Sequence, residues 1–404
     1  MKRDNRKTYG FLIAAILIVG GFGAWYVTSG DNGIDPEDEN PTGPRTLIDS
    51  FGNEFTVPST IERSVVQSGP SLTYTSFLGP EVMGTIVATS ADVSHEGGKN
   101  TYSAAYDLSG VATIPLASFL TDSIETIITL DPDIVIISSS NQLTDSVINF
   151  INTLKGAGIP VCAVSSVTGA TEESFQYNLR LVANIYGIPD RAEYVIQKAQ
   201  EYVRDLEALL DTVTEAETKT AFAGGINWGG ALGFTKSTTE YTPFQYFGDK
   251  VRNIMFEIKE WDGNPWTQQV SWEMLYDYDE THGIDMIFID SGSGYSLVVT
   301  EYAEFPDRFT TLNAWQTAEV YAVLPWVSRG LLPDSSIIIA YQIALMLYPE
   351  SFDASFDIED FGKEVWETFV GYEGAGDVVY AMQREYLAGL GVEGLYSKSP
   401  LLSS

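Results

Sequence analysis

The chain is short of the residues that most often carry chemistry. Its 404 residues include one cysteine, Cys162, and two histidines, His95 and His282. A lone cysteine excludes an intramolecular disulfide, and two histidines are too few for a histidine-rich cage around zinc or manganese. Cys162 lies in the apolar run GIPVCAV, which favours a small buried residue over a nucleophile. His282 lies in the acidic turn DYDETHGID, so we expect it to be exposed.

Sequence motifs of common catalytic centres are also missing. The chain has no GxSxG, no HExxH, no GxxxxGK[ST], and no GxGxxG after the first predicted strand. We therefore expect a protein that is not an enzyme and needs no cofactor. A surface structural or adhesion module is the alternative from another class, but such modules typically show internal repeats or many short strands, and neither is visible here.

Basic side chains are scarce. The chain has 22 lysines and arginines against 55 acidic residues, which gives a net charge of -33. Such a surface repels phosphate backbones, so nucleic acid is excluded as a partner. Two interpretations of the acidity stay open: a solvated surface that keeps the protein soluble, as in a salty medium, or an acidic site that collects cations.

The amino terminus predicts a membrane helix. Lysines and arginines cluster in residues 2–7 and precede the uncharged run of residues 10–27, which is long enough to cross the hydrocarbon core. Trp25 and Tyr26 end the run, and acidic residues follow it, so the folded part is expected outside the cell. A cleaved signal peptide is the alternative. We favour an uncleaved anchor because no small-x-small cleavage site follows the run, and no cysteine follows it to carry a lipid.

Strands and helices alternate along the rest of the chain. DIVIIS and IPVCAVS in the first half, and IDMIFID and VYAVLPW in the second, are apolar runs typical of buried parallel strands. Between the halves, an apolar stripe at helical period predicts one long helix over residues 191–213. The expected fold is α/β, with two lobes that each hold a parallel sheet flanked by helices. The predicted parts are a membrane anchor or signal (1–28), a flexible tether (29–45), an N-terminal lobe (46–188), a connecting helix (189–215) and a C-terminal lobe (216–396).

Each half also contains a glutamate near the start of a helix that leads into a buried strand. Glu125 lies in SIETIITLDPDIVIIS, and Glu273 lies in VSWEMLYDYDETHGIDMIFID. The helix dipole favours a glutamate at either place alone. Two glutamates at matching places predict a pair of exposed carboxylates that face a common partner.

The order of these segments resembles a known family, the cobalamin- and ferric-siderophore-binding proteins of ABC importers. The resemblance covers about residues 45–390 and is carried by seven segments: DSFGNEFTVP, ERSVVQSGPS, IETIITLDPDIVII, LKGAGIPVCAVSS, QQVSWEML, VYAVLPW and LYPESFD. It implies an extracytoplasmic binding protein with two lobes joined by one long helix, which works with a permease dimer and its ATPase. It also implies that Glu125 and Glu273 dock onto arginines of the two permease subunits.

Ligand is expected between the lobes, beyond the carboxyl ends of the strands. The residues that we expect to bind it are Gln67, Ser71, Tyr74, His95, Tyr102, Ser139, Asn141, Asn227, Trp228, Tyr295, Trp326 and Arg329. An indole covers a flat ring system and a guanidinium suits an anionic chelate, although core packing and a structural salt bridge are the alternatives. An iron chelate or a corrinoid is the expected ligand, with heme or an oxyanion such as molybdate as alternatives.

Overall fold

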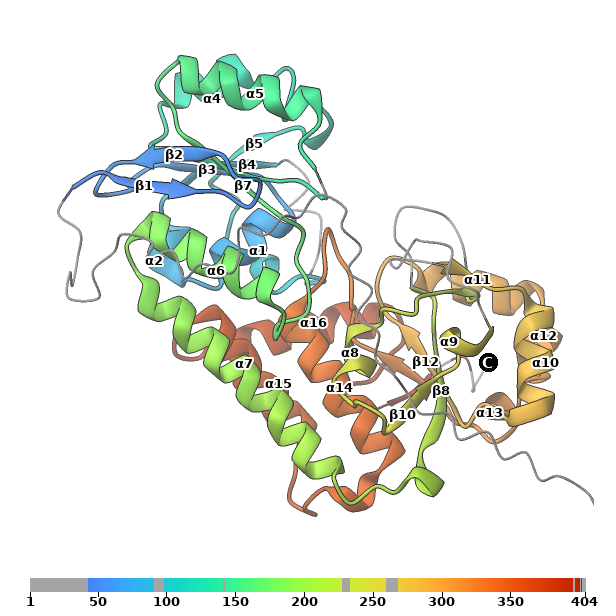
Figure 1. Ribbon diagram of the computed structural model, residues 1–404. Helices are drawn as coiled ribbons and strands as arrows, with labels where there is room; N and C mark the ends of the chain where they lie inside the picture. Colours follow the sequence, from blue (N-terminus) through green and yellow to red (C-terminus); the bar gives the residue numbers. More distant parts are fainter. Residues whose placement is uncertain are drawn as a thin grey trace, which may run out of the picture. The chain divides into compact units, whose positions relative to one another are not determined.

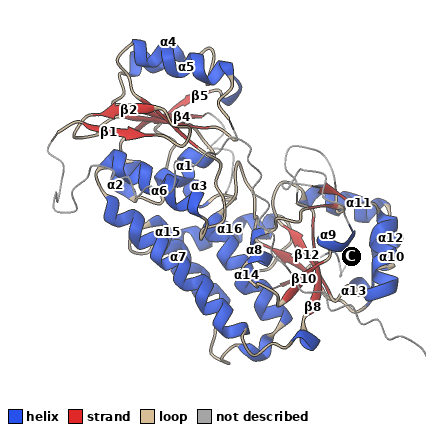
Figure 2. Cartoon of the chain, in the orientation of Figure 1, coloured by secondary structure: helices blue, strands red, loops and turns tan. Residues whose placement is uncertain are grey.

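The computed structural model describes residues 43–90, 98–140, 142–226, 233–258, 268–394, 397–399 and 401, within one compact unit, Thr42–Ser404. Its architecture is α/β, with two five-stranded sheets (Figures 1 and 2). Among the described residues, no helix is both long and apolar enough to cross a membrane. The predicted membrane helix and residues 29–42 of the predicted tether lie outside the described residues.

The first sheet is parallel throughout, with the strand order β5-β4-β3-β6-β7. Its strands are β3 (Ser64–Val66), β4 (Ile86–Ser90), β5 (Ala112–Ile114), β6 (Ile134–Ser138) and β7 (Val161–Val164). Strands β3 and β7 are buried along their whole length, and β6 is buried except at its last residue. Helices cover both faces of this sheet, so the side chains on both sides of these strands are buried. This explains why these strands are uninterrupted apolar runs in the sequence.

The two faces of the first sheet bury alternate side chains of each strand. Val135 and Ile137 belong to the cluster under helices α4 (Ile124–Leu130) and α5 (Asp145–Gly156). Ile136 belongs to the cluster on the opposite face. The helices there are α1 (Pro70–Ser76), α2 (Pro80–Met83) and α6 (Glu173–Tyr186) (Figure 1). Cys162 is fully buried in this cluster, as predicted, and burial raises the pKa of its thiol.

The predicted long helix is α7 (Pro189–Leu210), which joins the first sheet to the second along the chain. Proline at its first position suits a helix start, since that N–H has no partner in the helix. The buried side chains form the predicted stripe and pack against α6, α14 and α15.

The second sheet has the order β10-β8-β12-β13-β14. Its strands are β8 (Lys219–Gly224), β10 (Val251–Asn253), β12 (Met286–Asp290), β13 (Val320–Val323) and β14 (Ser397–Lys398). The first four are parallel, as predicted, but β14 pairs with β13 in antiparallel orientation. The predicted parallel sheet is confirmed for these four strands, and the two residues of the antiparallel edge strand β14 are too few to leave a signal in the sequence.

Helices flank the second sheet as well (Figure 1). They are α8 (Thr242–Gln245), α9 (Met255–Ile258), α10 (Trp272–His282), α11 (Tyr295–Glu304), α12 (Pro306–Thr310), α13 (Asn313–Gln316) and α14 (Pro333–Leu347). Two further helices, α15 (Ile358–Val370) and α16 (Ala375–Gly389), pack on each other and reach back to α3 (Thr101–Ala105), which follows β4 of the first sheet.

Several short elements were not predicted from the sequence. The chain enters the fold through an antiparallel pair, β1 (Arg45–Ile48) and β2 (Glu54–Val57). A second small pair joins β9 (Lys236–Ser237) to β11 (Gln268–Gln269). His282, at the end of α10, is exposed as expected and stacks on Tyr278. The predicted boundaries of the lobes stay a prediction.

Candidate functional site

Loops that follow the carboxyl ends of strands in the two sheets contact each other. The loop after β3 meets the loop after β13 at Gly69 and Arg329, where a Cβ built on Gly69 would lie 2.7 Å from the carbonyl oxygen of Arg329. Both residues have left-handed backbones, with φ of 85° at Gly69 and 60° at Arg329. Glycine is required at position 69 for this approach. In α/β proteins with an open sheet, ligands bind beyond the carboxyl ends of the strands. Here those ends of the two sheets are brought together.

A second link between the loops joins Thr101 to Asp334. Thr101 begins α3, and Asp334 lies in the first turn of α14. The hydroxyl of Thr101 donates to the Asp334 carboxylate, and both side chains are buried. Burial raises the pKa of Asp334 to about 6, although the hydrogen bond from Thr101 opposes the shift. No charge on a described residue contributes to that shift, so the buried carboxylate lacks a counter-ion among them.

Asp290, the last residue of β12, accepts hydrogen bonds from two loops of the second sheet. One carboxylate oxygen accepts the backbone N–H of Gly292 at 2.8 Å, and the other accepts that of Trp326 at 2.7 Å. Burial raises the pKa of Asp290 to about 7, and the two N–H donors oppose the shift. Sequence reasoning missed this residue, although IDSGSG, a buried strand ending in an acid and small residues, carried the signal.

Several buried polar atoms on these loops and on helices α14 and α16 have no hydrogen-bond partner among the described residues. Asn100 Oδ1, Ser291 Oγ, Asp334 Oδ1, Ser335 Oγ and both amide atoms of Gln383 are such atoms. Leaving one of them unpaired costs about 1–3 kcal/mol. Hydrogen-bonding capacity of this kind is available to a polar ligand or to ordered water.

Close contacts connect the segments that carry these atoms. The hydroxyl of Tyr386 on α16 donates to the carbonyl oxygen of Ser291 at 2.5 Å. The Lys99 ammonium lies 5.6 Å from the centre of the Tyr386 ring. A Cβ built on Gly98 would lie 2.7 Å from the carbonyl oxygen of Met382, the residue before Gln383. Loops from both sheets therefore meet beside α16. We call this region the strand-end site, and it comprises Asn100, Thr101, Ser291, Asp334, Ser335 and Gln383.

Among the predicted ligand residues of the first half, Gln67, Ser71 and Tyr74 are buried. The side-chain oxygen of Gln67 accepts the backbone N–H of Ser138 at 2.9 Å, which ties β3 to β6. The Ser71 hydroxyl donates to the carbonyl oxygen of Gln67 at 2.7 Å. Burial raises the pKa of Tyr74 far above its usual value. These side chains hold the loop after β3 in shape.

Tyr102 is also buried, and its hydroxyl accepts a hydrogen bond from the Asn100 amide at 2.9 Å. Ser139 is half-buried and donates to the carbonyl oxygen of Gln142 at 2.9 Å. Tyr102 therefore supports the strand-end site through Asn100, whereas Ser139 closes a local turn.

In the second half, Tyr295 and Trp326 are buried, whereas Arg329 is exposed. The Trp326 ring packs edge-on against Tyr241 at 5.1 Å, so it lies in the core, the alternative that the sequence left open. The other four predicted ligand residues lie outside the described residues: His95, Asn141, Asn227 and Trp228. Contact of any of the twelve with a ligand stays a prediction.

The two predicted docking glutamates occupy equivalent places. Glu125 lies in the first turn of α4 and Glu273 in the first turn of α10, and both are exposed. Helix α10 is capped by Ser271, whose hydroxyl accepts the backbone N–H of Met274 at 3.1 Å. Their docking role stays a prediction.

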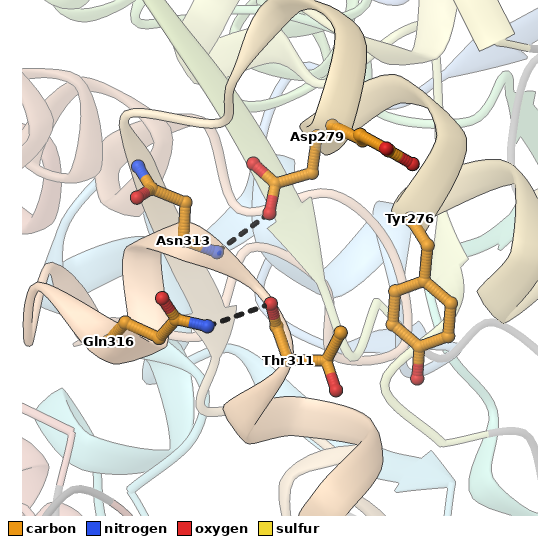
Figure 3. A pocket seen from close by; sticks show the side chains of 6 residues that line it. Tyr276, Asp279, Thr311, Asn313 and Gln316 are labelled. Atoms are coloured by element: carbon orange, nitrogen blue, oxygen red, sulfur yellow. Dashed lines mark hydrogen bonds between the residues drawn. The ribbon is translucent and has the colours of Figure 1, made fainter.

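A cavity of about 340 Å³ lies elsewhere, between α10 and α13 (Figure 3). Its lining consists of Tyr276, Asp279, Glu280, Thr311, Asn313 and Gln316. The Asp279 carboxylate already accepts the backbone N–H groups of Asn313 at 2.6 Å and Ile284 at 2.7 Å. Because its polar groups serve the local fold and it adjoins none of the strand-end loops, we take the strand-end site as the functional one.

Solved structures share this fold at low sequence identity. The molybdate-bound protein MolA of Haemophilus influenzae has a TM-score of 0.59 and 17% identity, covering 81% of this chain and 98% of its own. The nickel-bound protein Ceue of Helicobacter pylori has a TM-score of 0.58 and 17% identity, covering 82% and 98%. A periplasmic heme-binding protein of Pseudomonas aeruginosa has a TM-score of 0.51 and 18% identity, covering 73% and 95%.

No curated protein matches the sequence. Residues 87–321, more than half of the chain, match the family described as periplasmic binding protein. This family and the similar solved structures are solute-binding proteins and not enzymes, as the sequence predicted. The chain belongs to the periplasmic binding protein family, of the type that serves ABC importers.

Proposed function

We propose that this protein captures an iron chelate or a corrinoid at the strand-end site and delivers it to an ABC permease. The main support for this proposal is the buried contact between Thr101 and Asp334, whose chain neighbours Asn100 and Ser335 each carry a buried polar atom with unused hydrogen-bonding capacity. A ligand seated there would touch loops of both sheets and hold them together.

The chemistry of the site favours a ligand rich in amide, hydroxyl or hydroxamate groups. Asn100, Ser335 and Gln383 offer neutral donors and acceptors, and Asp334 offers an acceptor. Corrinoids and siderophores carry many such neutral groups, and a buried site that pairs them gains specificity from each hydrogen bond. The uncompensated carboxylate of Asp334 repels an oxyanion, which needs a cationic clamp. An oxyanion such as molybdate, or heme, is the second candidate, because similar folds bind these ligands.

Delivery would use the exposed glutamates at the two helix starts. Glu125 on α4 and Glu273 on α10 would meet arginines of the two permease subunits. The amino-terminal apolar run, residues 10–27, would keep the protein at the outer face of the membrane.

Native mass spectrometry and absorbance spectroscopy of the full-length protein, purified from its own host, test the proposal. We expect a bound small molecule with the mass and visible spectrum of a corrinoid or a ferric chelate. Bound heme or molybdate would replace the first ligand class with the second. Failure to bind cyanocobalamin, a ferric hydroxamate, a ferric catecholate, hemin or molybdate would contradict ligand capture and favour a surface structural module.

A further inference from the structure

The carboxyl-terminal ends of two helices from distant parts of the chain meet beside α7. Helix α1 ends at Ser76, and helix α15 ends at Val370. The last carbonyl groups of a helix have no partner within it and carry a negative partial charge. Two such ends repel each other unless a positive group or hydrogen-bond donors lie between them.

Arg191, in the first turn of α7, supplies both. Its Nε donates to the carbonyl oxygen of Phe77, just after α1, at 2.9 Å. Its Nη2 donates to the carbonyl oxygens of Thr368 and Phe369, in the last turn of α15, at 2.7 and 2.8 Å. One guanidinium therefore joins two helix ends that belong to different parts of the fold.

These three carbonyl oxygens are the hydrogen-bond acceptors of the Arg191 guanidinium among the described residues. Desolvation lowers the pKa of the half-buried guanidinium, and Tyr106 and Tyr194, rather than a carboxylate of a described residue, oppose that shift. A Cβ built on Gly371, where φ is 85°, would lie 2.6 Å from Nη2 of Arg191. Glycine at the end of α15 therefore leaves room for the guanidinium.

Two tyrosines add hydrogen bonds here: Tyr106 bridges the ends of α1 and α15, and Tyr372, just after α15, bonds the end of α3. The hydroxyl of Tyr106 lies 2.9 Å from the carbonyl oxygen of Ser76 and 3.0 Å from that of Val370. Tyr372 donates to the carbonyl oxygen of Ala105 at 2.8 Å. The rings of Phe77 and Phe369, at the ends of the same two helices, meet edge-on at 4.9 Å. We call this group the helix-end clamp: Arg191, Tyr106 and Tyr372 with the ends of α1 and α15.

We propose that Arg191 is a positioning residue, which fixes how the part around the first sheet is set against the part around the second. Helix α1 follows β3 of the first sheet, whereas α15 lies beside α7 and packs on α14 of the second half (Figure 1). The clamp would limit opening at the strand-end site and set the spacing of Glu125 and Glu273. Its consequence for uptake rests on the proposed function, but the clamp itself does not.

Pulsed electron paramagnetic resonance on the ligand-free protein tests the clamp. Spin labels are placed at Thr129→Cys on α4 and Asp277→Cys on α10, two exposed positions, while Cys162 stays buried. In the labelled protein that keeps Arg191, we expect a narrow distribution of the distance between the two labels. We expect Arg191→Met to shift or broaden it by about 5 Å or more, the scale of rigid-body and helix-shift motions. Arg191→Lys should give an intermediate result, because a single ammonium cannot reproduce the planar fork.

The matched control is Arg180→Met on the neighbouring helix α6. Arg180 pairs with Glu193 at 2.6 Å on the surface, so its loss should leave the distribution unchanged. If Arg191→Met does not fold, Arg191→Lys and Tyr106→Phe take its place, and both should broaden the distribution. Distributions equal to that of the parent protein in all folded clamp variants would overturn the proposal. Ligand capture would stand after that result, since it is measured separately by mass spectrometry.

Discussion

The hydroxyl of Thr101 donates a hydrogen bond to the carboxylate of Asp334, although 233 positions separate the two residues in the chain. The bond connects the helix that follows β4 of the first sheet to the helix that follows β13 of the second. Its buried carboxylate has no counter-ion among the described residues. A ligand bound at this contact would touch segments of both sheets at once.

The stability of the protein should depend on pH through Asp334. Its pKa is about 6 in the folded chain and 3.8 without burial, so the folded state binds the proton more tightly. The stabilisation is complete below the lower value and is lost as pH rises through about 6. Asp334→Asn removes this dependence. Relative to the parent, the variant should gain up to about 3 kcal/mol between pH 4 and pH 7.

Urea denaturation of the parent and of Asp334→Asn, measured at several pH values, gives this difference directly. Using the difference cancels the effect of the large negative charge, which both proteins share. Asp377→Asn, an exposed site on α16, is the control and should show no such trend. A difference that stays constant between pH 4 and pH 7 would argue against an uncompensated buried carboxylate.

Uptake should require both docking glutamates. Replacing Glu125 and Glu273 with arginine reverses the charge that would meet the permease arginines, so uptake of the native ligand should be abolished. Ligand affinity should stay within about twofold, because both residues are exposed at helix starts on α4 and α10. Glu207 and Glu385, exposed on α7 and α16, provide a double variant with the same change in charge. Normal uptake by the Glu125/Glu273 variant would show the docking assignment to be wrong.

Gly69→Ala should destabilise the protein more than an ordinary glycine substitution. The new Cβ would meet the carbonyl oxygen of Arg329 at 2.7 Å, and the left-handed backbone alone costs about 1–2 kcal/mol. We expect a loss of about 2–4 kcal/mol in the free energy of unfolding, measured with urea. Gly110→Ala, where nothing lies within 4 Å, is the control. Equal stability of the two variants would mean that the loops after β3 and β13 are not pressed together.

Much of the fold could be predicted from the sequence because long elements leave strong patterns. Apolar runs such as Ile134–Ser138 mark strands buried on both faces, and the stripe in α7 recurs at helical period. The pair β1 and β2, helix α3 and strand β14 were missed, since two to five residues carry no measurable period.

The candidate site could be predicted by place but not by residue. The rule for open α/β sheets indicated the strand ends, and the loops do meet there. In the sequence, Asp334 is an acidic residue at the start of a helix, which is a common structural feature and does not indicate a site. Only folding reveals its contact with Thr101, and the same holds for the burial of the Gln383 amide on α16. Trp326 was predicted to bind ligand because its ring is flat. In the structure this ring is buried and packs against Tyr241.

Hydrogen–deuterium exchange of the full-length protein, with and without the ligand identified by mass spectrometry, tests the central claim most directly. We predict that the ligand slows exchange together in segments of both sheets, residues 67–71 and 98–101 of the first and residues 291–295 and 325–335 of the second. Protection confined to one sheet, or centred on the cavity between α10 and α13, would contradict capture at the strand-end site.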